Sequence, residues 1–555
     1  MKRLLTIALA FSTLVAACDG TRTGGRGGSG GTGGSGGTGG SGGTGGTGGT
    51  GGTDDAGFVG DPTTCADAEM YKTYIGCDYW PTVVANNVWS IFDFAVVVSN
   101  PGMTAANVTV TGPMSTNQTV TVQPNTLVKI YLPWVTALKG PDADAQGGAQ
   151  PLTASVLAKT SAYHLVSTVP VLVYQFNALE YAPKNGPAGK NWTKCPGKGN
   201  PACFSYSNDA SLLLPSTAMT GNYRVFTEHG NGTTAQPGMP GYIAITATQD
   251  ATSVKVQLSS TANTLAGTGI PAIATGGKAT ITLNAGDVVE LMGQGVTGVD
   301  LSGSEVQADK PIQIIGGMAC VNNPVGGTDS IGFPLSCDHI EETVMPEETL
   351  GRHYVVPRPT GPHKTPVAHT VRFIGNVDGT NLTYTSTVAG APKTLNAGQV
   401  VELATVNTDF EVTGDHEFMV TMIQQSGGLV DPTATDSEGD PSLSVAVAVE
   451  QYRLNYVFLA PSDYDSNFAD IVMPSGTTLM IDGAAVTATS TPLGGTSTYV
   501  TVRVPLTAGS GNGAHTLIAD QPIGLQVIGY GLYTSYQYPA GLNLLAIAPP
   551  PPPIP

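Results

Sequence analysis

Short runs of alternating apolar and polar residues fill the chain from residue 54 onward. Residues 242–248, 252–258 and 280–283 are examples, and Ile, Val and Thr recur in them. Alternation with a period of two is typical of β-strands that bury one face, and β-branched residues favour the same structure. Asp-Gly and Asn-Ala-Gly sequences between the runs predict turns. Helical periodicity is rare, although residues 346–350 fit one helical turn. The pattern therefore predicts an all-β protein.

The chain also repeats itself. One element contains the sequence Ala-Asp-x-Pro-Ile or a shortened form of it, and its copies lie at residues 167–174, 308–317, 414–420 and 519–529. A second element, built on Leu-Asn-Ala-Gly followed by Val-Val-Glu-Leu, has copies at residues 283–291, 395–403 and, more weakly, 505–509. Internal repeats of this kind indicate a series of similar structural units.

We interpret the repeats as four β units, which span residues 65–182, 205–320, 338–428 and 440–540. About seven short strands per 100 residues suit an antiparallel β-sandwich. The predicted fold is therefore a tandem series of about four antiparallel sandwich-like repeats. A propeller-like ring of β units is the alternative, although propeller blades usually have only about 40–50 residues.

The first 17 residues have the pattern of a secretory signal. Lys2 and Arg3 precede a mostly apolar stretch, and small residues lead up to Cys18. The ending Leu-Val-Ala-Ala-Cys resembles the lipobox of bacterial lipoproteins, whose cysteine becomes the first residue of the mature chain and carries lipid. The apolar stretch is shorter than the roughly 20 residues that span a bilayer. The resemblance implies lipid anchoring at Cys18 in the cell envelope, at the outer membrane or cell surface.

The segments at the two ends differ from the rest of the chain. Within the region 18–53, residues 24–53 contain only Gly, Ser and Thr apart from Arg26. This composition cannot bury apolar surface, so it predicts a disordered tether with a root-mean-square span of roughly 30–35 Å. Residues 541–555 form a Pro-rich tail that favours the polyproline II conformation.

Composition excludes one class of partner and indicates the redox environment. The net charge is -18, so the chain lacks the basic footprint of a nucleic-acid-binding protein. Six cysteines remain besides Cys18, and they lie in close pairs: Cys65 and Cys77, Cys195 and Cys203, Cys320 and Cys337. An exported protein favours disulfides over thiolate metal sites. Several pairings are possible, and we prefer the sequential one because each bond closes a short loop.

Candidate chemistry is sparse. Asp431, Asp436, Glu438 and Asp440 cluster between the third and fourth units. Such oxygen ligands suit calcium, but the spacing is not that of an EF-hand, and we interpret the cluster as a solvated acidic linker with calcium as the alternative.

The histidines give no metal motif either. Three of them share one segment, at His353, His363 and His369, and are interpreted as surface residues. His164 and His515 lie in repeat-equivalent positions, which indicates a structural role.

Aromatic residues gather at Trp80, Trp89, Phe92 and Phe94 in the first unit and at Tyr530, Tyr533, Tyr536 and Tyr538 in the last. They suit either a binding platform or packing, and we favour packing. No phosphate loop, dinucleotide fingerprint or nucleophile elbow occurs in a folded context, so we expect no enzyme activity and no cofactor.

Several stretches resemble the N-terminal domain of the IgG Fc-binding protein family. They comprise residues 92–100, 162–177, 207–215 and 337–342, with Pro346, 350–351 and 354–356 after them. The resemblance covers roughly residues 75–540. Together with the anchor and the tether, it implies a surface lipoprotein with a binding or adhesion role toward an extracellular glycan, matrix component or glycoprotein. A secreted hydrolase with a dispersed carboxylate site and a passive structural envelope protein are the alternatives.

Overall fold

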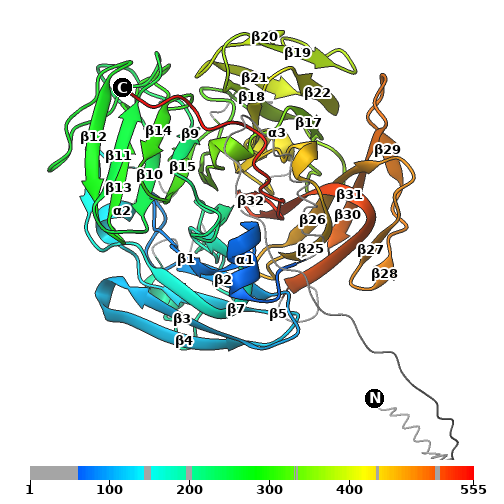
Figure 1. Ribbon diagram of the computed structural model, residues 1–555, viewed down its shortest axis with the longest axis horizontal. Coiled ribbons are helices and arrows are strands. Elements are labelled where there is room, and N and C mark those ends of the chain that lie inside the picture. The colour runs from blue at the N-terminus through cyan, green and yellow to red at the C-terminus, as the bar shows by residue number, and fades with distance from the viewer. Residues whose placement is uncertain are drawn as a thin grey trace, which may run out of the picture. The chain divides into compact units, whose positions relative to one another are not determined.

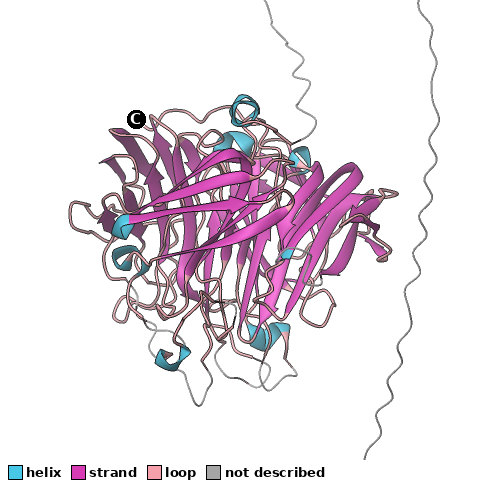
Figure 2. Cartoon of the chain, turned by 90° about the horizontal axis from the view of Figure 1, so that it is seen from below, coloured by secondary structure: helices cyan, strands magenta, loops and turns pink. Residues whose placement is uncertain are grey.

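Six antiparallel β-sheets carry the described part of the chain (Figure 1). The computed structural model describes residues 61–142, 150, 152–184, 186–195, 203–329, 332, 335–432, 437–506 and 513–555. Strands dominate it and the helices are short (Figure 2), so the all-β prediction is confirmed. The predicted signal, Cys18 and the tether lie outside the described residues.

Units 1 and 4 each form one continuous sheet around a long strand. Unit 1 has the order β4-β3-β7-β2-β5, with β1 and β8 paired to β7; unit 4 has the order β28-β27-β31-β26-β30-β29, with β25 and β32 paired to β31. The strands of unit 1 are β1 (Gly76–Tyr79), β2 (Phe94–Asn100), β3 (Ala106–Gly112), β4 (Thr116–Val122), β5 (Thr126–Leu132), β7 (His164–Phe176) and β8 (Ala210–Leu212). Those of unit 4 are β25 (Arg453–Leu459), β26 (Ser466–Pro474), β27 (Leu479–Ile481), β28 (Ala484–Ala485), β29 (Ser490–Pro492), β30 (Tyr499–Leu506), β31 (Ala514–Gly531) and β32 (Thr534–Pro539).

Units 2 and 3 each contain two sheets. Unit 2 pairs its strands as β16-β15-β10-β13-β6 and β12-β11-β14-β9, and unit 3 as β17-β22-β19-β20 and β21-β18-β23-β24. The strands of unit 2 are β6 (Val156–Ala158), β9 (Asn222–Arg224), β10 (Gly241–Ala247), β11 (Thr252–Gln257), β12 (Lys278–Leu283), β13 (Val288–Met292), β14 (Glu305–Ala308), β15 (Ile312–Val321) and β16 (Asp338–Thr343). Those of unit 3 are β17 (His353–Val356), β18 (His369–Gly375), β19 (Thr380–Tyr384), β20 (Thr394–Leu395), β21 (Val400–Val406), β22 (Phe410–Gly414), β23 (Phe418–Gln424) and β24 (Leu443–Val445).

The helical elements of the described chain are single or double turns. They are α1 (Cys65–Tyr71), α2 (Thr136–Lys139), α3 (Gly427–Val430) and the 3-10 turns η1 (Pro113–Ser115), η2 (Trp192–Lys194), η3 (Glu347–Thr349) and η4 (Val449–Gln451). The turn expected at residues 346–350 is η3. Helix α1 begins with a capping box, because Thr64 accepts the N–H of Asp67 while the Asp67 carboxylate accepts the N–H of Thr64.

Within unit 3 the two sheets share one apolar core, as the sandwich-like prediction requires. Phe373 of one sheet and Phe410 of the other have ring centroids 6.0 Å apart. Both residues are fully buried in a cluster that draws on strands of both sheets. Burial of alternate side chains between facing sheets explains the period of two in the sequence.

The repeated element that contains Asp309, Asp415 and Asp520 lies where the chain changes its strand partners. In unit 2 it separates β14 from β15, whereas in unit 4 it lies inside the continuous strand β31. Its aspartates accept a backbone N–H from a neighbouring strand end: Asp309 from Ser253 at 2.8 Å, Asp415 from Asn381 at 2.7 Å and Asp520 from Thr478 at 2.9 Å. The repeat therefore marks the same structural step in successive units.

The four units are arranged as a propeller-like ring, the alternative of the sequence analysis (Figure 1). After each long strand comes a short strand, namely β8, β16, β24 and β32, and these four lie next to one another in a closed cycle. Each stays in the sheet of the preceding strand, so the sheets of units 1, 2 and 3 extend past the expected unit ends. In addition β6, which lies within the sequence range of the first unit, pairs with β13 of unit 2.

A buried carboxylate lies where the four central strands meet. Asp209, next to β8, is fully buried and accepts backbone N–H groups from Glu341 of β16, Leu443 of β24 and Gln537 of β32, at 3.1, 2.9 and 3.4 Å. One side chain thus bonds the central strands of all three other units. Burial raises the pKa of Asp209 well above its usual value, although these N–H groups oppose the rise.

The Pro-rich tail packs onto unit 2. The Lys255 ammonium donates to the carbonyl of Ile554 at 2.8 Å, and Gln307 bonds the backbone of both Pro552 and Ile554. In Figure 1 this red segment runs from near β32 to the green unit. The C-terminal residues therefore link unit 4 to unit 2 across the ring.

Candidate functional site

A cleft of about 720 Å³ lies at the border between units 2 and 3. Unit 2 contributes residues 257–261 and the loop before β14, and unit 3 contributes residues 396–400 and Glu402. Most of these side chains are polar, and none of the described residues that line the cleft is a Phe, Tyr or Trp. The lining therefore offers many hydrogen-bond donors and acceptors along with apolar surface.

Two glycines bring the units into contact beside this cleft. A Cβ atom on Gly303 of unit 2 would lie 2.0 Å from the carbonyl oxygen of Gly398 of unit 3. Both residues also have positive φ values, 78° and 72°, which glycine adopts without strain. Arg224 donates to the carbonyl of Gly303 at 3.2 Å. The backbone contact fixes the separation of the two cleft walls.

Arg372 provides the charge at the base of the cleft. It is buried in β18, directly opposite Glu402 of β21 in the strand register. Its guanidinium forms an ion pair with Asp300 and lies 3.6 Å from a Glu228 oxygen and 3.4 Å from a Glu402 oxygen. One cation from unit 3 therefore joins two carboxylates of unit 2 to one of its own unit.

The pKa values of these groups reflect their different contacts. Burial raises the pKa of Glu228 to about 7, and the Arg372 charge only partly offsets this effect. Burial also acts to raise the pKa of Asp300, but Arg372 and the hydrogen bonds from Ser302 outweigh it and lower the pKa below its usual value. The same contacts raise the pKa of Arg372, so the guanidinium stays charged.

Three side chains of the cleft have the atoms and the proximity to hold a metal ion. Glu228, His229 and Glu402 each place one ligand atom within 4.8 Å of those of the other two. Glu228 is buried, His229 is partly buried and Glu402 is exposed. Among the residues that the structure describes, these three are the His, Cys, Asp or Glu side chains whose ligand atoms all lie this close to one another.

Comparison with known proteins places the chain in a family. The model of the family described as "IgGFc binding protein" matches residues 209–529, which is more than half of the chain. The chain belongs to the IgGFc-binding protein family. The matched range contains both walls of the cleft.

Two further comparisons extend this result. The human IgGFc-binding protein is 29% identical to this family member over 194 residues, which cover 35% of this chain and 3% of the human protein. The chain thus corresponds to a small part of that relative's length. A solved structure of a tetra-tandem repeat in the extending region of a large adhesion protein aligns over 84% of this chain with a TM-score of 0.09 and 12% identity, too low for any structural likeness.

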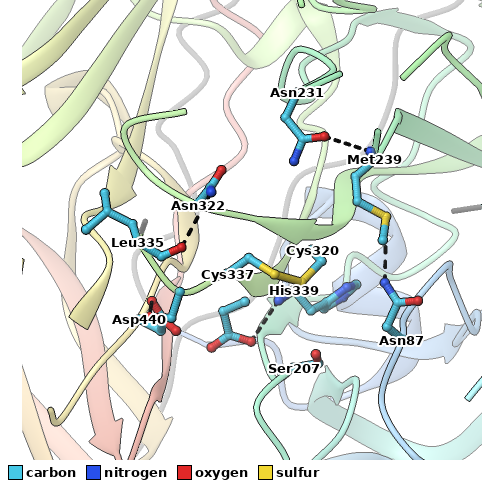
Figure 3. The surroundings of a disulfide bond; sticks show 12 residues. Asn87, Ser207, Asn231, Met239, Cys320, Asn322, Leu335, Cys337, His339 and Asp440 are labelled. Atoms are coloured by element: carbon cyan, nitrogen blue, oxygen red, sulfur yellow. Dashed lines mark hydrogen bonds between the residues drawn. A yellow bond between two sulfur atoms is a disulfide. The ribbon is translucent and has the colours of Figure 1, made fainter. Parts of the chain in front are cut away.

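The six cysteines of this family member form the sequential disulfides expected from their spacing. Cys65 bonds to Cys77, Cys195 to Cys203 and Cys320 to Cys337. The third bond (Figure 3) joins the end of β15 to the residue before β16, so it fixes a central strand of the ring. These bonds lie away from the cleft lining and support the fold.

The acidic candidates between units 3 and 4 do not converge. Asp436 lies outside the described residues. Asp431 is buried and accepts a hydrogen bond from His363 at 2.8 Å, and Asp440 is fully buried and accepts hydrogen bonds from Ser336 and Gly427. Glu438 is half-buried. The solvated-linker interpretation is thus wrong for Asp431 and Asp440, because both carboxylates are buried among neighbouring strands and loops.

The histidines serve different structural purposes. His164 bonds Asp78 at 2.6 Å and stacks on Trp80, and His515 bonds Asp482 at 2.7 Å, so these two have the structural role expected of them. His353 bonds Glu411 at 2.7 Å.

His369, expected at the surface, is buried instead. It lies in β18, which pairs with a strand on each side. Burial lowers the pKa of His369 to about 3, so the imidazole is neutral inside the sheet.

The aromatic groups pack in the interior. Tyr530, Tyr536 and Tyr538 are fully buried, and Tyr538 lies 4.7 Å from Tyr174 between ring centroids. Phe92 and Phe94 are fully buried too, and Trp80 and Trp89 nearly so. The packing interpretation is confirmed for these residues.

Sequence reasoning missed the charged group in the cleft. Glu402 belongs to the repeated element at residues 395–403, and its counterpart Glu290 lies in the copy at 283–291. Glu290 is buried and accepts the N–H of Ala85 at 2.8 Å, whereas Glu402 opens into the cleft. The usable signal was Arg372, an isolated charge in an apolar strand whose cross-strand neighbour is the repeated glutamate. Glu228 and His229 lie outside any repeat.

Proposed function

We propose that this protein is a surface-tethered lipoprotein that binds an extracellular glycoprotein in the cleft between units 2 and 3. The observation that carries the proposal is the cleft of about 720 Å³ at the border of units 2 and 3. Its volume lies within the range typical of ligand sites, and its lining is rich in side chains that donate and accept hydrogen bonds. The name of the human relative, IgGFc-binding protein, supports a protein ligand of this kind.

The tether supports a role outside the cell. The Leu-Val-Ala-Ala-Cys18 ending would supply a lipid, and the Gly/Ser/Thr-rich segment up to residue 53 would separate the lipid from the ring. A lipid of this sort anchors a protein without a membrane-spanning segment. In the described part of the chain no helix is both long and apolar enough to cross a bilayer.

A hydrolase is the second candidate, and one observation favours it. Glycosidases need two carboxyl groups about 5–10 Å apart, and Glu228 and Glu402 approach one another in the cleft. However, Arg372 contacts both carboxylates, and no Phe, Tyr or Trp among the described residues lines the cleft to stack on a sugar ring. These features support a non-catalytic binding site.

A passive structural protein of the envelope is the remaining alternative, and such a protein would have no need of the cleft.

The test is a binding assay with a panel of ligands. The whole chain is immobilised and titrated with IgG Fc, a mucin glycoprotein and isolated cell-surface polysaccharide. The proposal predicts saturable binding to a glycoprotein of the panel. Binding to polysaccharide alone would assign a glycan ligand, and turnover of any panel member would favour the hydrolase. Absence of saturable binding to every member would contradict a recognition role for these ligand classes.

A further inference from the structure

The contacts of His229 determine which of its ring nitrogens is free to bind a cation. Nδ1 lies 2.9 Å from the carbonyl oxygen of Gly230. A carbonyl only accepts, so Nδ1 carries the proton of the neutral imidazole and Nε2 keeps its lone pair. This Nδ1–H to carbonyl bond is the arrangement that orients metal-binding histidines in proteins.

The free nitrogen faces a carboxylate. Nε2 of His229 lies 3.7 Å from Oε1 of Glu228, which also accepts the backbone N–H of His229 at 2.8 Å. Two groups that both accept can lie together stably only when a cation is between them, either a proton on the ring or a metal ion. A separation of 3.7 Å is close to that of two ligand atoms that each lie roughly 2.0–2.2 Å from one zinc ion.

A third ligand comes from the other wall. The Glu402 carboxylate of unit 3 lies within 4.8 Å of the Glu228 and His229 ligand atoms, which belong to unit 2. Glu402 is held from behind by Arg372, whose Nε is 3.4 Å away. The three ligands therefore already surround a common point at the cleft and need only a small side-chain adjustment to contact one ion.

The charge of the group is unbalanced without a further cation. Three carboxylates, those of Glu228, Asp300 and Glu402, surround the single guanidinium of Arg372. Three carboxylates and one guanidinium leave two net negative charges in a partly buried place beside His229. Burying uncompensated charge is costly. A divalent cation would neutralise the group.

We propose that Glu228, His229 and Glu402 form a divalent-cation site that links unit 2 to unit 3. One imidazole nitrogen and two carboxylate oxygens suit zinc, or manganese, better than calcium, which prefers oxygen ligands alone. Three protein ligands leave at least one coordination position open, and the cleft lies beside it. The ion pins the two walls together and offers that position to water or to an oxygen atom of a ligand.

The test is a metal titration that needs no ligand, so it is independent of the proposed binding function. The whole chain is first treated with a chelator and then titrated with Zn²⁺ by isothermal calorimetry. One site is expected, and H229Q and E402Q should each weaken zinc binding at least about 10-fold, as losing a ligand does. E305Q is the matched control: Glu305 also lies near the cleft, paired with Arg224, but is no ligand, so affinity should change less than about twofold.

Cobalt substitution gives a second readout. Co²⁺ in the site should show visible absorption bands that disappear in H229Q, because the imidazole nitrogen sets the ligand field. Glu402 is exposed, so E402Q tests the site even if H229Q folds poorly. Zinc affinity that is unchanged in folded E402Q, or absence of zinc and manganese binding by the unmodified chain, would overturn the proposal. The same affinity loss in E305Q would show a general charge effect and would also overturn it.

Discussion

The carboxylate of Asp209 accepts the backbone N–H of Leu443 at 2.9 Å, although 234 residues separate them in the chain. The same oxygen accepts the N–H of Glu341, and the other oxygen accepts that of Gln537. Each of these partners belongs to a different unit. The ring is therefore closed at its centre by hydrogen bonds from one buried side chain, in addition to the packing of neighbouring sheets.

Replacing Asp209 should weaken the hydrogen bonds at the centre of the ring and lower the stability of the fold. In D209N one acceptor oxygen becomes an amide that donates, and it then faces N–H groups that also donate. Leaving buried N–H groups unpaired costs roughly 1–3 kcal/mol each, so we expect a loss of about 3 kcal/mol in the free energy of unfolding. Denaturant unfolding measures it. D309N is the control, since Asp309 bonds the single N–H of Ser253 at an exposed turn; an equal loss in both variants would contradict a special role for Asp209.

The disulfide between Cys320 and Cys337 should stabilise the centre of the ring against unfolding. It closes a loop with a sequence separation of 17 residues, for which the chain-entropy model gives about 3 kcal/mol. We expect the double variant C320S/C337S to lose that amount in denaturant unfolding. The pair C195S/C203S closes a shorter loop, with a separation of 8, and should lose less. The reverse order of the two losses would refute this account.

Stability should fall as the pH rises above neutrality. Burial raises the pKa of Glu290 to about 8 and the pKa values of Glu347 and Asp440 to about 7. These folded values exceed the unfolded ones, so the folded protein binds more protons, and the stabilisation is present at low pH and lost as the pH passes about 7–8. His369, with a folded pKa of about 3, makes the stability rise with pH, but only between about pH 3 and 6.5. Unfolding measured at pH 6.5 and 8.5 should therefore show the higher stability at 6.5.

The variant E290Q isolates one of these groups. The amide oxygen can still accept the N–H of Ala85, and the side chain no longer ionises. The decrease in stability between pH 6.5 and 8.5 should therefore become smaller by about 2 kcal/mol, because pH 6.5 lies about 1.5 units below the folded pKa of about 8 and each unit corresponds to about 1.4 kcal/mol. The exposed Glu69 provides the control, and E69Q should leave the pH dependence as it was. An unchanged slope in E290Q would mean that Glu290 does not titrate in this range.

The strands and the repeated units could be predicted because each depends on residues that are close together in the sequence. The period of two predicted the strands, and the repeated element predicted four units. The last three copies use the same aspartate contact to a neighbouring strand end. The ring was only an alternative. Its closure depends on Asp209 and on partners more than a hundred residues away, and no periodicity records such contacts.

The functional residues were harder to find for a related reason. The cleft arises where two units meet, so Glu228 and Glu402 become neighbours only in the folded ring. His369 was misplaced because its strand is central in the sheet, a position that the sequence of one strand does not reveal. The disulfides could be predicted because each closes a short loop within a single unit or its border.

The lipid anchor is tested by a single substitution. In C18S the thiol that would carry the lipid is absent, so the protein should leave the membrane fraction and appear in the soluble or secreted fraction. Fractionation followed by immunoblotting measures the change. The control is D19S, which alters the neighbouring residue and keeps the thiol. Unchanged membrane retention of C18S would refute anchoring through Cys18.

The most direct test of the account is ligand binding by a protein whose cleft is blocked. Ser260 lines the cleft and is exposed, so S260W fills the cleft without disturbing the core. Ser490, exposed on unit 4, gives the matched control S490W. With the glycoprotein of the panel that binds the unmodified chain, calorimetry should show affinity at least about 10-fold weaker for S260W and unchanged for S490W. Equal affinity of S260W and the unmodified chain would contradict recognition through the cleft between units 2 and 3.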